Sequence, residues 1–300
     1  MNDNPRRLVL VTGAGSGIGR ASVLRFARDG WDCLAGVRNA DAMGAWRDLS
    51  IADGDVARHV VPVMLDVTHA TDRDAVVREV EARGGRLHAL VNGAGIALPG
   101  TFEFGNADTD RAVVETNLLG PMALVRQLVP ALRAAAKSPV NPLHPAVVVN
   151  VASVAGIVPM PWMSPYNASK FGMVGWADAV DHELRGEGIR VVTVLPGTVR
   201  TPMLDRADAT LATEIDALPG SAPGSYRQGL THILEQSRRM ARFGKSPEAV
   251  AHVIVDVAGR RRPPTRVVVG ADGQLLRAII VCLPHQLAMM VIRGLFRPRG

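Results

Sequence analysis

Cysteine is scarce in this chain of 300 residues, which holds only Cys33 and Cys282. Two cysteines this far apart in the sequence provide neither a disulfide framework nor the ligands of a metal site, so we expect no bound metal. Aromatic residues make up only 4% of the sequence. The core must therefore be mainly aliphatic, and the chain lacks the interleaved aromatic side chains on which nucleic-acid bases stack.

The N-terminus lacks the features of a secretory signal peptide. Its first residues, Met-Asn-Asp-Asn-Pro-Arg-Arg, precede only a short apolar run, and no cleavage site follows. We therefore expect a cytoplasmic protein. The C-terminal tail is also too short to span a bilayer, because its uncharged stretch, residues 278–292, has fifteen residues, whereas about twenty are needed.

Acidic residues are rare beyond Gly259, where eight arginines accompany one acid, Asp272. The net charge of the whole chain is +6, so this tail carries +7 and the rest of the chain about −1 by subtraction. Because the body of the chain is nearly neutral, its arginine content does not indicate affinity for nucleic acid, and we expect no nucleic-acid partner.

Apolar residues make up 47% of the sequence, as is usual for a soluble α/β protein. Short apolar runs typical of buried strands alternate with stretches of helical periodicity. This alternation predicts a Rossmann-type, doubly wound parallel sheet of about seven strands in a single domain. The expected strands are residues 7–12, 32–37, 60–65, 87–92, 146–152, 189–195 and 265–269.

Four segments complete the expected organisation. Residues 1–270 should form a dinucleotide-binding catalytic domain. Within it, residues 198–245 are a long insertion with a proline- and glycine-rich centre, which predicts a mobile lid over the substrate. Residues 137–145 carry three prolines and should form a surface loop. Residues 271–300 should form an apolar, arginine-flanked helical extension.

The first expected strand ends in a glycine-rich turn, Thr12-Gly13-Ala-Gly-Ser-Gly17-Ile-Gly19, and a segment of helical periodicity follows. Glycines allow the chain to turn tightly and let backbone N–H groups approach a pyrophosphate. The N-terminus of the following helix also favours that negative charge. The order strand, glycine turn, helix therefore predicts a dinucleotide site.

Ser153, Tyr166 and Lys170 indicate a carbonyl or alcohol redox site. Ser153 ends the apolar strand 146–152, and ligands of doubly wound sheets bind beyond the carboxyl ends of the strands. Tyr166 and Lys170 are four residues apart, so they share one face of a helix. A nearby ammonium favours phenolate, and we expect it to lower the pKa of Tyr166 from about 10 toward the range of a general acid or base.

These motifs, with Asn92-Gly93-Ala94-Gly95, Asn117 and Pro196-Gly197-x-x-x-Thr201, resemble those of the short-chain dehydrogenase/reductase family over about residues 7–270. The resemblance implies that Ser153 and Tyr166 hydrogen-bond the substrate, while Lys170 holds the nicotinamide ribose. It also implies that Asn117 anchors a water of a proton relay that reaches Lys170. Members of the family often have two asparagines before Ala-Gly, where this chain has Asn92-Gly93.

The resemblance also extends the predicted cofactor site. Asp66 is similar to the family's adenine-contacting aspartate, and Thr201 to the residue that contacts the carboxamide. The residues that we expect to bind the cofactor are Thr12, Gly13, Ser16, Gly17, Ile18, Gly19, Arg38, Asp66, Val67, Asn92, Ala94, Gly95, Tyr166, Lys170, Pro196, Gly197, Val199 and Thr201.

The end of the second expected strand favours NADP over NAD. An acid about twenty residues after the glycines would bond the ribose 2′-OH of NAD and repel the 2′-phosphate of NADP. This chain has Val37 at that place, followed by Arg38, whose guanidinium can pair with the phosphate. Arg38 resembles the basic residue of NADP-preferring family members, and Arg20 is a second candidate. An exposed loop arginine without such a role is the alternative.

The substrate side is rich in apolar residues. Ile157, Val158, Met160, Trp162 and Met163 lie between Ser153 and Tyr166, and Met203-Leu204 begin the lid. Methionines and a tryptophan make an adaptable apolar wall, although some of them could simply pack beneath the lid. The pattern is similar to members acting on retinoids, steroids or other lipophilic alcohols and ketones. We expect the substrate to contact Ser153, Met160, Trp162 and Tyr166.

Two other functions and two places for the tail stay open at this stage. The chain could reduce 3-oxoacyl groups on a carrier protein, or sense redox state by binding the dinucleotide without turnover. We expect a homo-oligomer. The tail, residues 275–297, is too apolar to extend freely into water. It either packs over the substrate pocket or at a subunit contact, or attaches peripherally to an anionic membrane.

Overall fold

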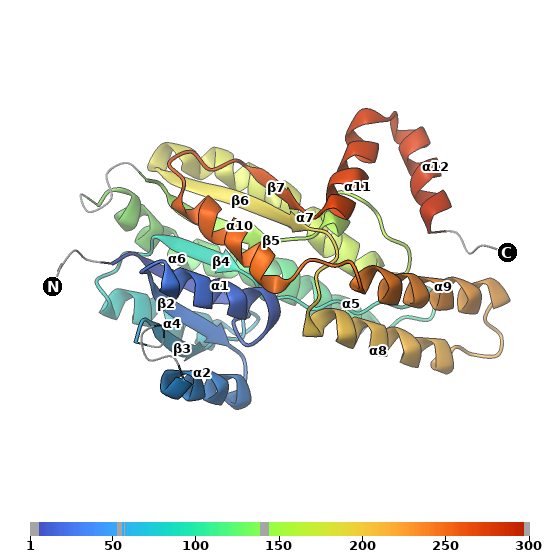
Figure 1. Cartoon of the computed structure of the whole chain (residues 1–300), viewed down its shortest axis with the longest axis horizontal. Coiled ribbons are helices and arrows are strands. Elements are labelled where there is room, and N and C mark those ends of the chain that lie inside the picture. Colours follow the sequence, from blue (N-terminus) through green and yellow to red (C-terminus); the bar gives the residue numbers. More distant parts are fainter. Residues whose placement is uncertain (1–5, 53–55, 57, 139–143, 297–300) are drawn as a thin grey trace.

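Seven parallel strands form one sheet in the computed structural model, which describes residues 6–52, 56, 58–138 and 144–296. The strand order is β3-β2-β1-β4-β5-β6-β7, so the chain winds outward from β1 in both directions (Figure 1). Each expected strand is present, with its ends shifted by no more than two residues. The strands are β1 (Leu8–Thr12), β2 (Asp32–Val37), β3 (Val60–Met64), β4 (Ala89–Asn92), β5 (Ala146–Val151), β6 (Ile189–Pro196) and β7 (Arg266–Val269).

Helices cover both faces of the sheet. Phe26 of α1, Trp46 of α2 and Ile254 of α10 pack on one face, and Val80 of α4 and Leu128 of α6 pack on the other, together with α7. The covering helices are α1 (Gly17–Arg28), α2 (Ala40–Ala52), α4 (Ala70–Ala82), α5 (Ala107–Val114), α6 (Gly120–Ala136), α7 (Ser164–Leu184) and α10 (Pro247–Gly259).

The strands are apolar on both sides because both faces are buried. In β1, Val9 and Val11 point to the α1 side while Leu8 and Leu10 point to the α6 side, as the two-residue period of a strand requires. This explains why the strands appear in the sequence as continuous apolar runs rather than as alternating patterns.

The carboxyl ends of the strands meet at one edge, and the loops that follow them form the functional site. Register pairs Thr12 with Gly36 and Asn92 with Asn150, so the residues after β1, β2, β4 and β5 are brought level with one another. A π-helical turn, Glu115–Leu119, joins α5 to α6 beside this edge. A 3₁₀ turn, Val154–Gly156, follows β5.

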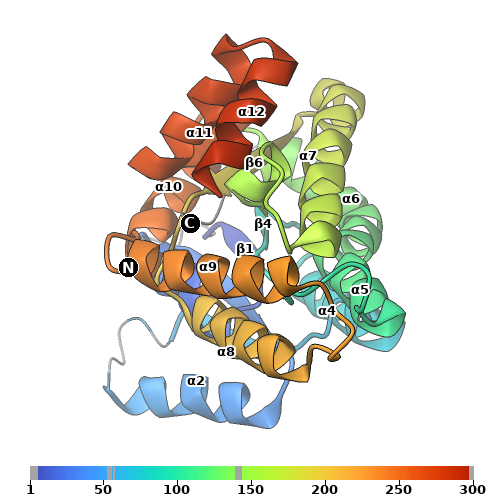
Figure 2. The same ribbon diagram turned by 90° about the vertical axis from the view of Figure 1, so that its right-hand side faces the viewer.

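Two pairs of helices lie beyond this edge. The lid expected at residues 198–245 consists of α8 (Pro202–Ala217) and α9 (Gly224–Ala241). The expected C-terminal extension consists of α11 (Ala271–Cys282) and α12 (His285–Leu295), separated at Pro284. Figures 1 and 2 show α11 and α12 side by side at one end of the molecule, with α9 beneath them and α8 below it.

The remaining expectations concern a membrane span, the surface loop and the two ends of the chain. Within the described ranges, no helix is both long enough and apolar enough to cross a membrane. Most of the surface loop expected at residues 137–145 lies outside the described residues. The same holds for the beginning of the catalytic domain, residues 1–5, and for the end of the tail, residues 297–300.

Candidate active site

Ser153 lies where β5 ends, as its strand predicts, and caps the 3₁₀ turn that follows. Its Oγ accepts a hydrogen bond from the backbone N–H of Ala155 at 3.1 Å. Because that bond uses a lone pair of the hydroxyl, the Ser153 proton is free to be donated to an oxygen in the cavity. The capping bond thus fixes the direction of the side chain and leaves its donor available.

Tyr166 and Lys170 lie one turn apart on α7, and both are buried. The Lys170 ammonium is 5.5 Å from the centre of the Tyr166 ring. Its Nζ donates a hydrogen bond to the carbonyl oxygen of Val151, at the end of β5, over 3.1 Å. This bond ties the catalytic helix to the strand that carries Ser153, so the three side chains converge as expected.

Burial dominates the electrostatics of this pair. It raises the pKa of Tyr166, because phenolate is less stable away from water, and the hydrogen bond with Ser153 acts in the opposite direction. Burial also lowers the pKa of Lys170 from 10.5 to about 8. The pKa of Tyr166 is thus raised and not lowered as expected, because burial outweighs the hydrogen bond with Ser153.

Asn117 is fully buried in the π-helical turn, a helix type that is often found at functional sites. Its Oδ1 accepts from the N–H of Ile96 at 2.8 Å, and its Nδ2 donates to the Ile96 carbonyl at 2.9 Å. The same Nδ2 donates to Ser169 Oγ at 3.1 Å. The side chain thus holds the loop after β4 against α7, and its role in a proton relay stays a prediction.

The glycine turn has the close backbone packing that its sequence implies. Gly13 has φ +69°, and a Cβ on it would lie 2.8 Å from Ala94. A Cβ on Gly19 would lie 2.3 Å from the Gly13 carbonyl oxygen. Only glycine fits at these positions without moving the backbone. The turn and the N-terminus of α1 form a cradle in which backbone N–H groups can meet a pyrophosphate.

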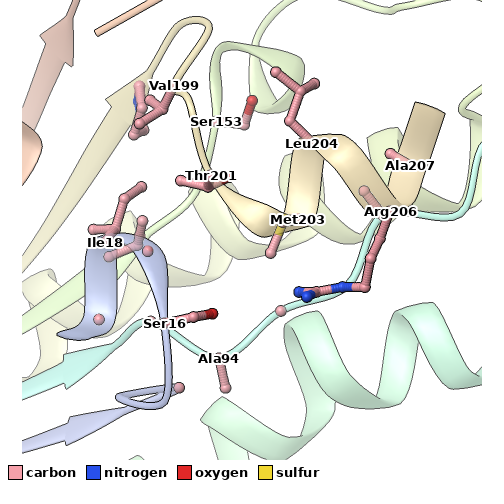
Figure 3. Close-up of a pocket in the computed structure, with 18 of the residues that line it drawn as sticks. Ser16, Ile18, Ala94, Ser153, Val199, Thr201, Met203, Leu204, Arg206 and Ala207 are labelled. Atoms are coloured by element: carbon pink, nitrogen blue, oxygen red, sulfur yellow. The ribbon is translucent and has the colours of Figure 1, made fainter. Parts of the chain in front are cut away.

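One cavity of about 680 Å³ joins the glycine turn, the predicted catalytic residues, the expected lid and the tail (Figure 3). A volume of this size is typical of cofactor and substrate sites. The predicted residues that line it are Gly13, Ser16, Gly17, Ile18, Gly19, Arg38, Asp66, Val67, Ala94, Gly95, Ser153, Met160, Tyr166, Lys170, Pro196, Gly197, Val199 and Thr201.

Four predicted site residues lie behind the cavity wall instead. Thr12 Oγ1 accepts from the N–H groups of Gly93 and Ala94, each at 3.0 Å. Asn92 donates to the side chain of Asn150 across neighbouring strands at 2.8 Å. Thr12 and Asn92 therefore shape the loop that lines the cavity, although their own side chains do not line it. Asn117 and Trp162 are the other two.

Trp162 packs into the lid rather than lining the cavity. It is the one non-glycine residue with positive φ among those the structure describes, at 63°. Its carbonyl accepts from Gly100 N–H at 2.9 Å, and its ring meets Tyr226 of α9 edge to face, with centres 5.3 Å apart. The strained residue thus joins the loop before α7 to the lid, which agrees with the alternative that some of these apolar residues pack beneath it.

The adenine end of the cavity has both a cation and an acid. Arg38 lines it as predicted, and so does Asp41 from the first turn of α2. The motif pattern did not indicate Asp41, because it lies beyond the end of β2. Arg20 does not line the cavity; its guanidinium lies over the ring of Trp46, 4.8 Å from the centre. Arg20 therefore serves as a packing residue here.

The substrate end is walled mainly by apolar side chains from segments far apart in the sequence. Met160 and Met163 precede α7, while the lid and the tail supply the remainder. Figure 3 shows Met203 and Leu204 at the start of α8, and Arg206 one turn further on, with its guanidinium near the Ala94 loop. The lid and the tail were expected near the substrate as segments, and the structure adds their individual lining residues, Arg206, Ile233, Met240, Leu276 and Phe296.

Asp272, at the start of α11, connects the tail to the cofactor loop. Its carboxylate accepts from the N–H of Thr198 at 2.7 Å. It lies so close to Gly197 that a Cβ there would be 2.3 Å from a carboxylate oxygen. The turn after β6 lines the cavity, so α11 holds part of the predicted cofactor site in place. In the described part of the chain, no group of histidine, cysteine or acidic side chains is arranged to hold a metal.

The same fold and motifs occur in known proteins. Residues 7–212 match a family model described as short chain dehydrogenase. The chain is 32% identical over 275 residues to the 3-oxoacyl-(acyl-carrier-protein) reductase FabG of Thermotoga maritima, covering 90% of this chain and 98% of that relative. It is 30% identical over 268 residues to retinol dehydrogenase 8 of Bos taurus, covering 89% of this chain and 82% of that relative.

A solved structure confirms the architecture. A short-chain dehydrogenase from Streptomyces avermitilis superposes with a TM-score of 0.73 at 25% sequence identity, over 98% of this chain and 95% of that one. The match covers the lid and most of the tail as well as the sheet. The expected fold class is therefore confirmed by both the described strands and this comparison.

Proposed function

The chain belongs to the short-chain dehydrogenase/reductase family and is an enzyme, and from this premise we propose that it interconverts a carbonyl and an alcohol on an apolar small molecule with NADP(H). The observation that carries the proposal is the convergence of Ser153, Tyr166 and Lys170 on a cavity with apolar walls. The family uses a nicotinamide dinucleotide, and the choice of NADP and of substrate class is our inference.

Each catalytic side chain has a role that follows from its contacts. The Ser153 hydroxyl, whose lone pair is held by Ala155 N–H, donates to the substrate oxygen. Tyr166, kept protonated by burial, gives its phenol proton to that oxygen as the carbonyl is reduced. Lys170 stabilises the resulting phenolate with its charge. The bound nicotinamide supplies the hydride for reduction and accepts it in oxidation.

The glycine cradle and its neighbours suit the dinucleotide. Backbone N–H groups at the start of α1 favour the pyrophosphate, while Thr201 lies within contact distance of Gly17. Arg38 at the adenine end supports binding of a 2′-phosphate. Asp41 lines the same region, so the preference for NADP depends on the guanidinium outweighing this carboxylate.

A direct test compares kcat/KM for NADPH and NADH, and we expect NADPH to be preferred. Arg38→Gln should raise KM for NADPH about tenfold or more with little change for NADH, because one charge-assisted bond to the phosphate is lost. Arg20→Gln is the matched control, since Arg20 lies on Trp46 outside the cavity. Equal use of NADH by the unaltered enzyme would contradict the proposed cofactor preference.

The apolar walls support a lipophilic alcohol or ketone as substrate. Methionines at 160, 163, 203 and 240 are flexible and adapt to varied apolar shapes. We expect a panel of carbonyl compounds, assayed with NADPH, to show activity that rises with the apolar surface of the substrate. Preference for small, charged ketones would contradict this assignment.

A 3-oxoacyl reductase is the second candidate, because the Thermotoga maritima relative of that name is 32% identical over nearly its full length. The two candidates differ in what carries the acyl group. We expect free apolar ketones to be reduced more efficiently than a 3-oxoacyl thioester on carrier protein. The opposite order would favour the second candidate. A non-catalytic sensor is disfavoured by the complete catalytic set.

We further propose that the enzyme is a homo-oligomer. Leu119 and Phe171 are 49% and 42% exposed, and a Cβ on the neighbouring Gly172 would lie 2.8 Å from the Leu118 side chain, so α7 lies close to the π-helical turn here. The two exposed side chains therefore extend an apolar surface across the π-helical turn and α7. Light scattering after gel filtration should show more than one subunit, and Phe171→Glu should reduce the mass to that of one chain.

A further inference from the structure

The C-terminal helices α11 and α12 form a hairpin, residues 271–295, with two apolar faces. The inner face packs on Val154 and Val158, next to Ser153, and so belongs to the core beside the catalytic site. Figures 1 and 2 show that the hairpin stands at the end of the molecule with its other side away from the sheet. The inner-face residues are Leu276, Ile279, Ile280, Met289 and Ile292.

The outer face of the hairpin is apolar although it is exposed. Leu275, Val281, Leu287, Met290 and Leu295 leave between 40% and 68% of their surface accessible. On α12, Leu287 and Met290 lie opposite the inward-facing Met289 and Ile292, whereas on α11 Leu275 and Val281 lie on either flank of the residues that pack inward. An apolar face of this kind indicates an interaction, because soluble surfaces seldom gather large aliphatic side chains in one place.

The charges on the hairpin are of one sign. Arg277 on α11 and Arg293 on α12 are both exposed, and the sequence between 273 and 296 contains no acid. The hairpin's one carboxylate, that of Asp272, accepts a hydrogen bond from Thr198 N–H at its base. The exposed hairpin surface therefore combines aliphatic side chains with unneutralised positive charge.

We propose that the outer face of the hairpin docks on an anionic membrane surface, with both helices lying in the plane of the interface. Helices that lie at an interface bury one apolar face among the acyl chains and place basic residues at the lipid headgroups. The exposed aliphatic side chains and the two arginines supply these two components. Neither helix needs to cross the bilayer.

A second copy of the chain fits this face less well. A symmetric dimer through the hairpin would bring the same surface of each subunit together. Arg277 and Arg293 of both subunits would then lie in one interface, and the exposed surface of neither hairpin supplies a carboxylate to neutralise them. Buried like charges oppose association, whereas anionic headgroups neutralise both arginines.

The position of the hairpin connects the membrane to the cavity. Leu276 and Phe296 line the cavity, and the Leu295 carbonyl accepts a hydrogen bond from Gln236 of α9 at 3.0 Å. A membrane at the outer face would place the lipid phase one helix layer from the substrate cavity. This last step rests on the proposed apolar substrate, but the docking itself does not.

Sedimentation of the full-length protein with vesicles tests the docking directly. We expect binding to phosphatidylcholine vesicles that contain about one third phosphatidylserine, weaker binding to phosphatidylcholine alone, and release in high salt. Arg277→Gln/Arg293→Gln should weaken binding to anionic vesicles about fivefold for each charge removed. Val281→Gln/Met290→Gln should weaken binding to both vesicle types, because it removes exposed apolar surface.

Phe102→Gln is the matched control for the apolar variant, because Phe102 is 83% exposed on a loop outside the hairpin. Its binding should equal that of the wild type. No binding, or salt-insensitive binding equal for both vesicle types, would overturn the proposal. A self-association abolished by Val281→Gln/Met290→Gln, without vesicle binding, would assign the face to a second copy instead. Vesicle binding by a protein that reduces no carbonyl compound would leave the docking intact and refute the function alone.

Discussion

Lys170→Met should change how the stability of the apoenzyme depends on pH. The pKa of Lys170 is lowered by burial from 10.5 to about 8, and each pKa unit corresponds to about 1.4 kcal/mol. The folded state therefore binds the Lys170 proton less tightly than the unfolded state does. Keeping this side chain charged at neutral pH therefore makes the wild type less stable by roughly 3 kcal/mol.

The sign of the pH dependence follows from that shift. Between pH 8 and 10.5 the unfolded chain binds more of the Lys170 proton, so this residue makes the wild type more stable as the pH rises. Methionine lacks the titration. It also lacks the hydrogen bond to Val151, and an unpaired buried carbonyl costs about 1–3 kcal/mol. At pH 7 the free energy of unfolding of the variant should thus equal that of the wild type or exceed it by up to about 2 kcal/mol.

Urea unfolding followed by circular dichroism at pH 7 and pH 10 measures this difference. The stability of the variant relative to the wild type should fall by roughly 2–3 kcal/mol between the two pH values. The difference between the two proteins removes the contributions that other titrating groups make to the pH dependence. One such group is Cys33, whose pKa is raised by burial in the folded state. Exposed Lys245→Met is the control and should parallel the wild type. Parallel curves for Lys170→Met and wild type would refute the reasoning.

Three further predictions follow from contacts in the site. Asp272→Ala removes the acceptor for Thr198 N–H and should raise KM for the dinucleotide by about fivefold to thirtyfold. Asp272→Asn keeps an acceptor and should leave this KM unchanged. Equal KM values for Asp272→Ala and the wild type would contradict the positioning role of Asp272. Gly229→Ala should lower stability by about 1–3 kcal/mol, because its Cβ would lie 2.5 Å from the Trp162 ring, while Gly220→Ala, with open space around it, should be neutral in urea unfolding. Since burial raises the pKa of Tyr166, alcohol oxidation, which needs phenolate, should keep rising above pH 8, and a plateau below that value would argue against it.

The sequence was sufficient to predict the sheet and the convergence of Ser153, Tyr166 and Lys170 on one cavity. Strands buried on both faces appear as continuous apolar runs, and Ser153, Tyr166 and Lys170 depend on local positions, a strand end and one helical turn. Their convergence follows because β5 and α7 are neighbours in a doubly wound sheet. The glycine turn was predictable for the same reason, since its chemistry lies in consecutive backbone groups.

The parts that were not predicted depend on packing between distant segments. Trp162 was expected in the substrate wall, but its position is set by Gly229 of α9, more than sixty residues away. For the tail, packing over the substrate pocket was one of the alternatives, and Leu276 and Phe296 line the cavity because the tail folds back over the turn after β5. The pKa of Tyr166 was misjudged because spacing gives the neighbouring cation and not the loss of water.

The most direct test of the central claim is single-turnover hydride transfer from NADPH by Tyr166→Phe with a reducible apolar ketone. Phenylalanine fills nearly the same volume and lacks only the hydroxyl, so NADPH should bind to the variant with an affinity close to that of the wild type. The rate of carbonyl reduction should fall by about 10²–10⁴-fold, the range expected when a general acid is removed. Reduction at a rate close to that of the wild type, with NADPH bound, would contradict the assignment of Tyr166 as the proton donor and the proposed function that depends on it.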